Sequence, residues 1–215
     1  MVVAVDVLRA FTTAAYAFAA GAREIWLAAE VDAALALAAR LPDALVMGEE
    51  HGRRPVGFDL SNSPVEVFAA DLADRVLVQR TSAGTRGILA AVDAEHLYAA
   101  SLVCASATAA AMRRHGHAGV TYVITGRFPD HAGGGEDDLM TAQLIERART
   151  GLPLDAEATA RAVAATREAD VTLALGDGHV HPDDIPYATA VDRFGFAMRA
   201  ERIDGRLMLV REDVS

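Results

Sequence analysis

Short apolar runs alternate along the first two thirds of this chain with longer stretches whose apolar residues recur at helical spacing. The runs are four or five residues long and are bounded by polar residues or glycine, which is typical of buried strands. Predicted strands cover residues 2–5, 24–28, 44–47, 75–79, 96–100 and 120–124, and predicted helices cover 12–20, 31–41, a stretch from 64 onward, 88–92, 105–115 and 137–150. This alternation indicates an α/β fold, which we expect to be a three-layer α/β/α arrangement around a mostly parallel sheet.

The pattern changes after residue 150. Further helices are predicted over residues 155–167, 169–175 and 187–193, with the polar loop GDGHVHPDDIP between the second and the third. The last two strands, 194–201 and 206–211, flank Asp204-Gly205, a pair typical of a tight turn, and this favours a C-terminal hairpin. Neither a repeat nor a linker divides the chain, so we expect one domain over residues 1–215.

Four polar segments follow predicted strands: residues 6–9, 48–64, 80–86 and 126–138. Ligands of parallel sheets collect outside the carboxyl ends of the strands, so these segments are expected to meet at one edge. The segment 48–64, GEEHGRRPVGFDLSNSP, is far longer than an ordinary connection of about four to six residues. A loop that lines a site and a solvated surface loop both explain this segment taken alone.

Two of these segments have an alternative explanation that involves no ligand. The turn RTSAGTR places hydroxyl groups and a glycine where a strand gives way to a helix, a setting that can bind an anion or simply cap the helix. Asp137 and Asp138 can likewise complement the dipole at a helix N-terminus. Asp6 is different, because a carboxylate directly after an apolar strand usually has a partner.

Taken together, the segments VDVLRAFTT, GEEHGRRPVGFDLSNSP, TSAGTRG and GEDD resemble, in order, the signatures of the 2-phosphosulfolactate phosphatase family. The resemblance covers roughly residues 2–150 and is weaker beyond them. It implies a three-layer α/β/α fold and a Mg²⁺-dependent acid phosphatase, which converts 2-phospho-3-sulfolactate to 3-sulfolactate on the way to coenzyme M. The residues on family motif positions are Asp6, Arg9, Glu49, Asp59, Asn62, Thr81, Gly84, Thr85, Arg86, Glu136 and Asp137.

The resemblance, together with the chemistry of the side chains, assigns roles to these segments. Catalytic roles are expected for Asp6, Arg9 and Arg86, substrate binding for Asn62, Thr81, Ser82, Gly84 and Thr85, and Mg²⁺ binding for Asp6, Glu49, Glu136 and Asp137. Mg²⁺ prefers carboxylate and water oxygens, and an arginine fork binds phosphoryl, carboxylate or sulfonate groups. Whether Asp6 attacks phosphorus or binds the metal stays open.

The chain departs from the family pattern in one turn. Family members commonly carry Thr-Asn before Gly-Thr, whereas Ser82-Ala83 stands here and lacks the side-chain amide. A phosphatase for another phosphorylated hydroxy acid, or a non-catalytic member that only binds an anion, therefore remains an alternative. The first predicted strand begins at residue 2, where relatives have an extension, and a longer natural N-terminus also stays open.

The composition limits the classes of molecule that the protein is expected to bind. The net charge of −10 argues against general nucleic-acid binding, and no apolar run reaches the roughly 18 residues of a membrane span. All 20 basic residues are Arg, which excludes chemistry that requires a lysine. The single cysteine, Cys104, suits a reducing cytoplasm. We expect a cytoplasmic protein that binds a small anionic phosphorylated substrate, with a homodimer as an open option.

Overall fold

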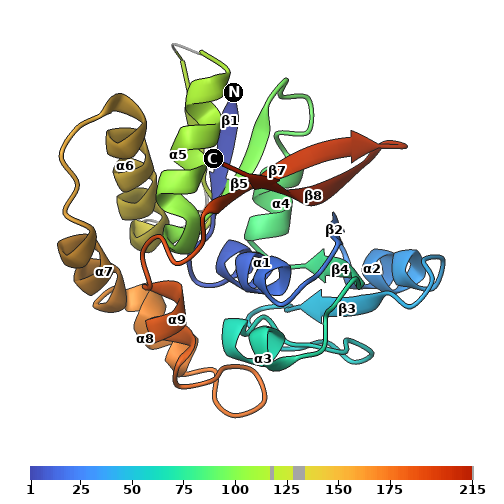
Figure 1. The fold of residues 1–215 in the computed structure, drawn as a ribbon. Coiled ribbons are helices and arrows are strands. Elements are labelled where there is room, and N and C mark those ends of the chain that lie inside the picture. Colours follow the sequence, from blue (N-terminus) through green and yellow to red (C-terminus); the bar gives the residue numbers. More distant parts are fainter. Residues whose placement is uncertain (117–118, 128–133, 215) are drawn as a thin grey trace.

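The structure is a computed structural model that describes residues 1–116, 119–127 and 134–214. In this part of the chain, helices surround one large sheet of eight strands (Figure 1). The strands are β1 (Val2–Val5), β2 (Glu24–Leu27), β3 (Leu45–Gly48), β4 (Val76–Arg80), β5 (Leu97–Ala100), β6 (Thr121–Ile124), β7 (Phe196–Ile203) and β8 (Arg206–Asp213). The six strands predicted before residue 150 are confirmed, each to within one residue at either end.

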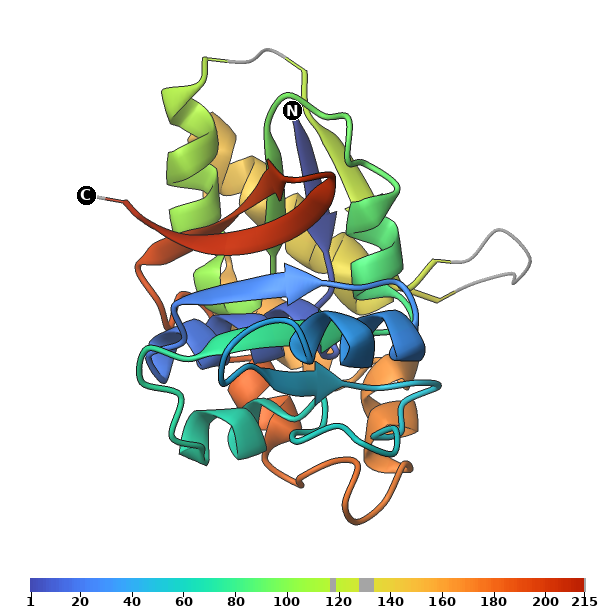
Figure 2. The same cartoon turned by 90° about the vertical axis from the view of Figure 1, so that its right-hand side faces the viewer.

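The sheet order is β3-β4-β2-β8-β7-β5-β1-β6, and most neighbouring strands are parallel. β4 pairs in parallel with β2 and β3, and β1 pairs in parallel with β5 and β6. The two final strands pair antiparallel with each other and lie between these two parallel groups, where β8 meets β2 and β7 meets β5. Figure 2 shows this pair in red, between β2 and the strands around β1.

The helices are α1 (Ala10–Ala19), α2 (Val31–Ala38), α3 (Pro64–Ala69), α4 (Gly84–Leu89), α5 (Ala105–Arg114), α6 (Glu136–Thr150), α7 (Ala156–Ala164), α8 (Arg167–Leu173) and α9 (Asp184–Ala188), with a 3₁₀ turn at Leu102–Cys104. Side chains alternate between the faces of a strand, and β1 follows this rule. Val3 and Val5 pack in one apolar cluster with α5 and α6, whereas Ala4 packs in a second cluster with α1. Apolar contacts thus hold helices on both faces of this strand.

Several helices differ from their predicted bounds by up to three residues, and two differ by more. The predicted helix 88–92 begins earlier, at Gly84, because the polar turn before it already forms the first helical turn. The predicted helix 187–193 is instead Asp184–Ala188, with Pro186 inside it. Proline is tolerated in the first turn of a helix because its missing N–H has no intrahelical acceptor there.

In both parallel groups, polar residues follow the carboxyl ends of the strands. Asp6 follows β1 directly, the loop from Glu49 follows β3, and Thr81 follows β4. The polar loop after β6 lies partly outside the described residues, which resume at Gly134. None of the helices in the described ranges is long and apolar enough to cross a membrane.

Candidate functional site

A cavity of about 300 Å³ lies where the carboxyl ends of β1, β3 and β4 meet. Its wall combines three of the four polar segments with the end of α8, from the last third of the chain. The lining residues are Asp6, Leu8, Arg9, Glu49, His51, Gly52, Asn62, Thr81, Ser82, Ala83, Val171, Thr172 and Leu175. The structure therefore brings together residues of both parallel groups, as the positions of the segments predict.

Asp6 lines this cavity and is buried, with only 5% exposure. Its carboxylate accepts hydrogen bonds from the backbone N–H of Ala10, at 2.8 Å, and from Thr125 Oγ1, at 3.0 Å. Gly84 packs directly against it, since a Cβ at this position would lie 2.7 Å from Asp6 Oδ2 and 2.6 Å from Ala10 Cβ. The glycine of the TSAGTRG motif is thus required by the close approach of α4 to Asp6.

Two further carboxylates lie beside Asp6 at the start of α6. Asp138 accepts hydrogen bonds from the backbone N–H groups of Val7 and Gly126, at 2.8 and 2.9 Å. Asp137 is 3% exposed, and its Oδ1 has no hydrogen-bond partner among the described residues. The loop after β1 and the start of α6 are therefore joined by Asp138, while Asp137 keeps one buried oxygen for another ligand.

Burial raises the pKa values of all three carboxyls. The pKa of Asp6 is raised to about 6, mainly by burial and also by the charge of Glu49, although hydrogen bonds and Arg9 oppose the shift. Burial and the nearby charge of Asp6 raise the pKa of Asp137 to about 7. The pKa of Asp138 is well above its ordinary value, through burial and its two acidic neighbours. A cation at this cluster would remove the unfavourable repulsion between them.

The polar groups of the turn after β4 form hydrogen bonds with other residues of the protein. The side chain of Thr81 accepts from the backbone N–H of Thr85 at 3.0 Å, and the Thr85 hydroxyl donates to the Thr81 carbonyl at 2.6 Å. The backbone N–H of Ser82 donates to Glu49, which also accepts from the Ser82 hydroxyl at 3.0 Å and from the backbone N–H of Gly52 at 2.6 Å. Several donors that were expected to face an anion therefore already have partners.

Arg9 and Asn62 supply polar groups to the same cavity. Arg9 is 3% exposed, and its Nη1 donates to Asp184 at 2.7 Å and to the carbonyl of His179 at 2.9 Å. Its Nε and Nη2 form no hydrogen bond with a described residue. Asn62 is 4% exposed, and within the described ranges its Oδ1 has no hydrogen-bond partner. Both side chains thus retain hydrogen-bonding groups without a partner among the described residues.

Five predicted site residues do not line the cavity. Gly84, Thr85 and Asp137 are buried next to residues that do line it, whereas Arg86 and Glu136 are exposed. The Arg86 side chain is 59% exposed and pairs with Glu30 on the surface at 3.2 Å. Glu136 is exposed at the first position of α6, whereas the next two acids are buried. The helix explains this result, because successive side chains point in different directions around its axis. Asp59, another motif residue, accepts from the Val46 backbone N–H at 2.8 Å and so fastens the long loop to β3.

Sequence reasoning did not assign a site role to three residues that support the cavity. The position of Asp138 in the sequence fits a residue that complements a helix dipole, and Thr125, which bonds to Asp6, carries no distinctive pattern. Asp184 lies in the last third, where the motifs are weak. His179 and His181 also lie there, and each ring Nδ1 accepts a backbone N–H, from Arg54 and from Asp183.

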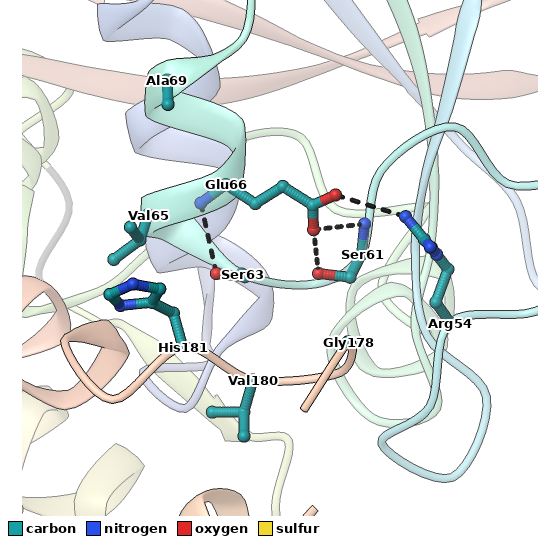
Figure 3. A pocket seen from close by; sticks show the side chains of 9 residues that line it. All are labelled: Arg54, Ser61, Ser63, Val65, Glu66, Ala69, Gly178, Val180 and His181. Atoms are coloured by element: carbon teal, nitrogen blue, oxygen red, sulfur yellow. Dashed lines mark hydrogen bonds and ion pairs between the residues drawn. The ribbon is translucent and has the colours of Figure 1, made fainter. Parts of the chain in front are cut away.

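A second cavity, of about 420 Å³, lies beside the N-terminus of α3 (Figure 3). Its acid, Glu66, is already paired with Arg54 at 3.3 Å and accepts hydrogen bonds from the backbone N–H and the hydroxyl of Ser61. His181 and Val180 lie across from this group in the figure. Although it is larger, this cavity contains none of the buried carboxylates described above, so the smaller cavity is the candidate site.

The buried acids provide a limited set of ligands for Mg²⁺. Among the described residues, no group of three or more His, Cys, Asp or Glu side chains is arranged to hold a metal ion. Mg²⁺ usually takes only one or two carboxylates and fills its other positions with water and phosphate oxygens. Asp6 and the unpartnered Oδ1 of Asp137 fit this smaller requirement.

The fold and the cavity define an α/β protein with a small cavity, lined in part by buried polar residues, at the carboxyl ends of its parallel strands. A family model described as 2-phosphosulpholactate phosphatase matches residues 1–191. The chain belongs to this family, which confirms the resemblance found in its motifs.

Three relatives share the name "Probable 2-phosphosulfolactate phosphatase". The protein of Bacillus subtilis is 36% identical over 144 residues, which cover 67% of this chain and 61% of the relative. The protein of Thermus thermophilus is 38% identical over 146 residues, with coverages of 67% and 60%. The chain thus spans less than two thirds of the length of each of these two relatives. The protein of Thermoplasma acidophilum is 27% identical over 213 residues, with coverages of 99% and 90%.

Proposed function

We propose that this protein is a Mg²⁺-dependent phosphatase that hydrolyses a small acidic phosphomonoester. The observation that carries the proposal is the position of Asp6 and Arg9. These residues are three positions apart after β1, both are buried, and both line one cavity beside Asp137. A carboxylate pair for a cation and an arginine for an anion are the two elements that phosphoryl transfer needs.

The nominal substrate is 2-phospho-3-sulfolactate, which would yield 3-sulfolactate and phosphate. The names of the relatives and the family description support this choice. A cavity of about 300 Å³ at the lower end of the usual range for ligand sites is suited to a small metabolite. In this proposal the reaction is a step toward coenzyme M and takes place in the cytoplasm. The protein acts alone or as a homodimer.

Five buried polar side chains have a role in this proposal. Asp6 and Asp137 would hold Mg²⁺, which when bound would neutralise their charge and polarise the phosphoryl group. Arg9 would bind the phosphoryl, carboxylate or sulfonate group through Nε and Nη2, and the Asn62 amide would orient the substrate. Thr125 and the Ala10 N–H hold the Asp6 carboxylate in place through their hydrogen bonds.

The test is phosphate release from a panel of phosphorylated hydroxy acids, with and without Mg²⁺. We expect release that requires Mg²⁺ and that is abolished by Asp6→Asn. Acid quenching during turnover would separate the two roles of Asp6, because nucleophilic attack leaves phosphate covalently bound to the protein. Binding of the panel without any release would contradict the proposal and support a non-catalytic anion-binding protein.

A further inference from the structure

Asp184, at the start of α9, is fully buried, with 0% exposure. Its two oxygens connect three parts of the chain. Oδ2 accepts from Arg9 Nη1 at 2.7 Å and from the backbone N–H of His181 at 3.0 Å, and Oδ1 accepts from the Ser63 hydroxyl at 2.6 Å and from the backbone N–H of Val65 at 3.4 Å. A buried carboxylate is tolerated when a cation and several donors satisfy it in this way.

This arrangement leaves a defined part of Arg9 for a ligand. Nη1 is occupied by Asp184 and by the carbonyl of His179, so the guanidinium plane is held at one corner. Its Nε and Nη2, which make no hydrogen bond to a described residue, form the two-pronged edge that binds an oxyanion through parallel hydrogen bonds. Because Arg9 lines the cavity, a fixed orientation of the plane determines where an anion can bind.

We propose that Asp184 is a positioning residue that orients Arg9 for binding of the phosphoryl group or another oxyanion of the substrate. The inference rests on the proposed function, since it assigns a partner to Arg9 in the same site. It brings into that site a residue from the last third of the chain, outside the stretch that carries the sequence motifs. A preoriented arginine loses less side-chain entropy when it binds an anion.

Asp184 also holds α3, and this structural role needs a separate measurement. Ser63, the N-cap of α3, bonds to the other oxygen of Asp184 and lines the second cavity rather than the candidate site (Figure 3). Ser63→Ala removes the side-chain connection to α3, where only the 3.4 Å contact from the Val65 N–H then remains, but it leaves the pair of Asp184 with Arg9. It is therefore the matched control: we expect a lower melting temperature with little change in anion binding.

The experiment is a double-mutant cycle with inorganic phosphate as the probe, measured by calorimetry in the presence of Mg²⁺. Asp184→Asn should weaken phosphate binding about tenfold, in line with the worth of a hydrogen bond to a charged group. In a chain that already carries Arg9→Gln, the same change should have almost no further effect, because Asp184 acts through Arg9. If Asp184→Asn does not fold, Asp184→Glu, which keeps the charge but displaces it, gives the same comparison.

Equal weakening of phosphate binding with and without Arg9, or no weakening in either chain, would overturn the inference. Failure of the wild-type protein to bind phosphate would overturn it as well. These binding measurements do not depend on catalytic turnover. If the protein releases phosphate but the effect of Asp184→Asn does not depend on Arg9, only the role of Asp184 is refuted. If the effect depends on Arg9 but the protein releases no phosphate, only the proposed function is refuted.

Discussion

Gly84 lies so close to Asp6 that a single added methyl group would stand 2.7 Å from the carboxylate oxygen Oδ2. The same Cβ would lie 2.6 Å from Ala10 Cβ, so neither neighbour leaves space for it. The contact joins the turn after β4 to the end of β1. A motif glycine thereby sets the position of the acid on which the proposed chemistry depends.

Gly84→Ala should consequently displace Asp6 or α4. Overpacking of this kind costs about 1–3 kcal/mol of unfolding free energy, and we expect a strong loss of phosphate release in addition. Chemical denaturation and the phosphate-release assay measure the two effects. Gly195→Ala is the control, since a Cβ there meets nothing within 4 Å and should change neither quantity. An active, fully stable Gly84→Ala variant would contradict the proposed importance of the contact.

Mg²⁺ should raise the melting temperature of the protein, because a ligand that binds only the folded state stabilises it. Asp6→Asn and Asp137→Asn should each reduce this shift, which thermal denaturation with and without Mg²⁺ would show. Glu136→Gln is a matched control from the same helix turn, since the structure places this acid on the surface. A loss of the shift in the Glu136 variant, with none in the Asp137 variant, would show that the metal ligands are misassigned.

Without Mg²⁺, stability should fall as the pH rises from about 4 to about 7. The pKa values of Asp6 and Asp137 are raised from 3.8 to about 6 and about 7, so the folded protein keeps protons that the unfolded chain has released. The stabilising contribution is complete below the ordinary pKa and is lost as the pH passes the folded values. Denaturation of Asp137→Asn should give a flatter profile across this window. An unchanged slope would contradict the expectation.

Two arginines of the motifs should behave differently. Arg9→Gln should lower kcat/KM by roughly a hundredfold, because it removes hydrogen bonds to a charged group. Arg86→Gln should have little effect, since Arg86 is exposed and pairs with Glu30 at 3.2 Å, and surface ion pairs contribute little. Steady-state kinetics on both variants measures the difference. Comparable losses in the two would mean that Arg86 reaches the substrate.

The sequence contained enough information to locate most of the fold. Apolar runs such as Val2–Val5 form strands wherever they are buried, and Pro64 with Ser63 before it marks the start of α3 as predicted. Its motifs also identified the family and the segments that meet at the cavity. These features are local, so they can be recognised from neighbouring residues alone.

The tertiary structure decided what depends on contacts between distant residues. The pairing of β8 with β2 and of β7 with β5, which places the last two strands inside the sheet, has no local signal. The rotation of α6 buries Asp138 and exposes Glu136, although both belong to one acidic run.

Asp184 illustrates the same limit most clearly. It lies 175 positions from Arg9 in the sequence, in a loop where three acids and two histidines look equally polar. The sequence by itself determined which residue types were present, the order of the elements and the family. Only the folded chain determined which carboxylate is buried against which cation, because burial and distance are properties of packing between segments and not of the segments themselves.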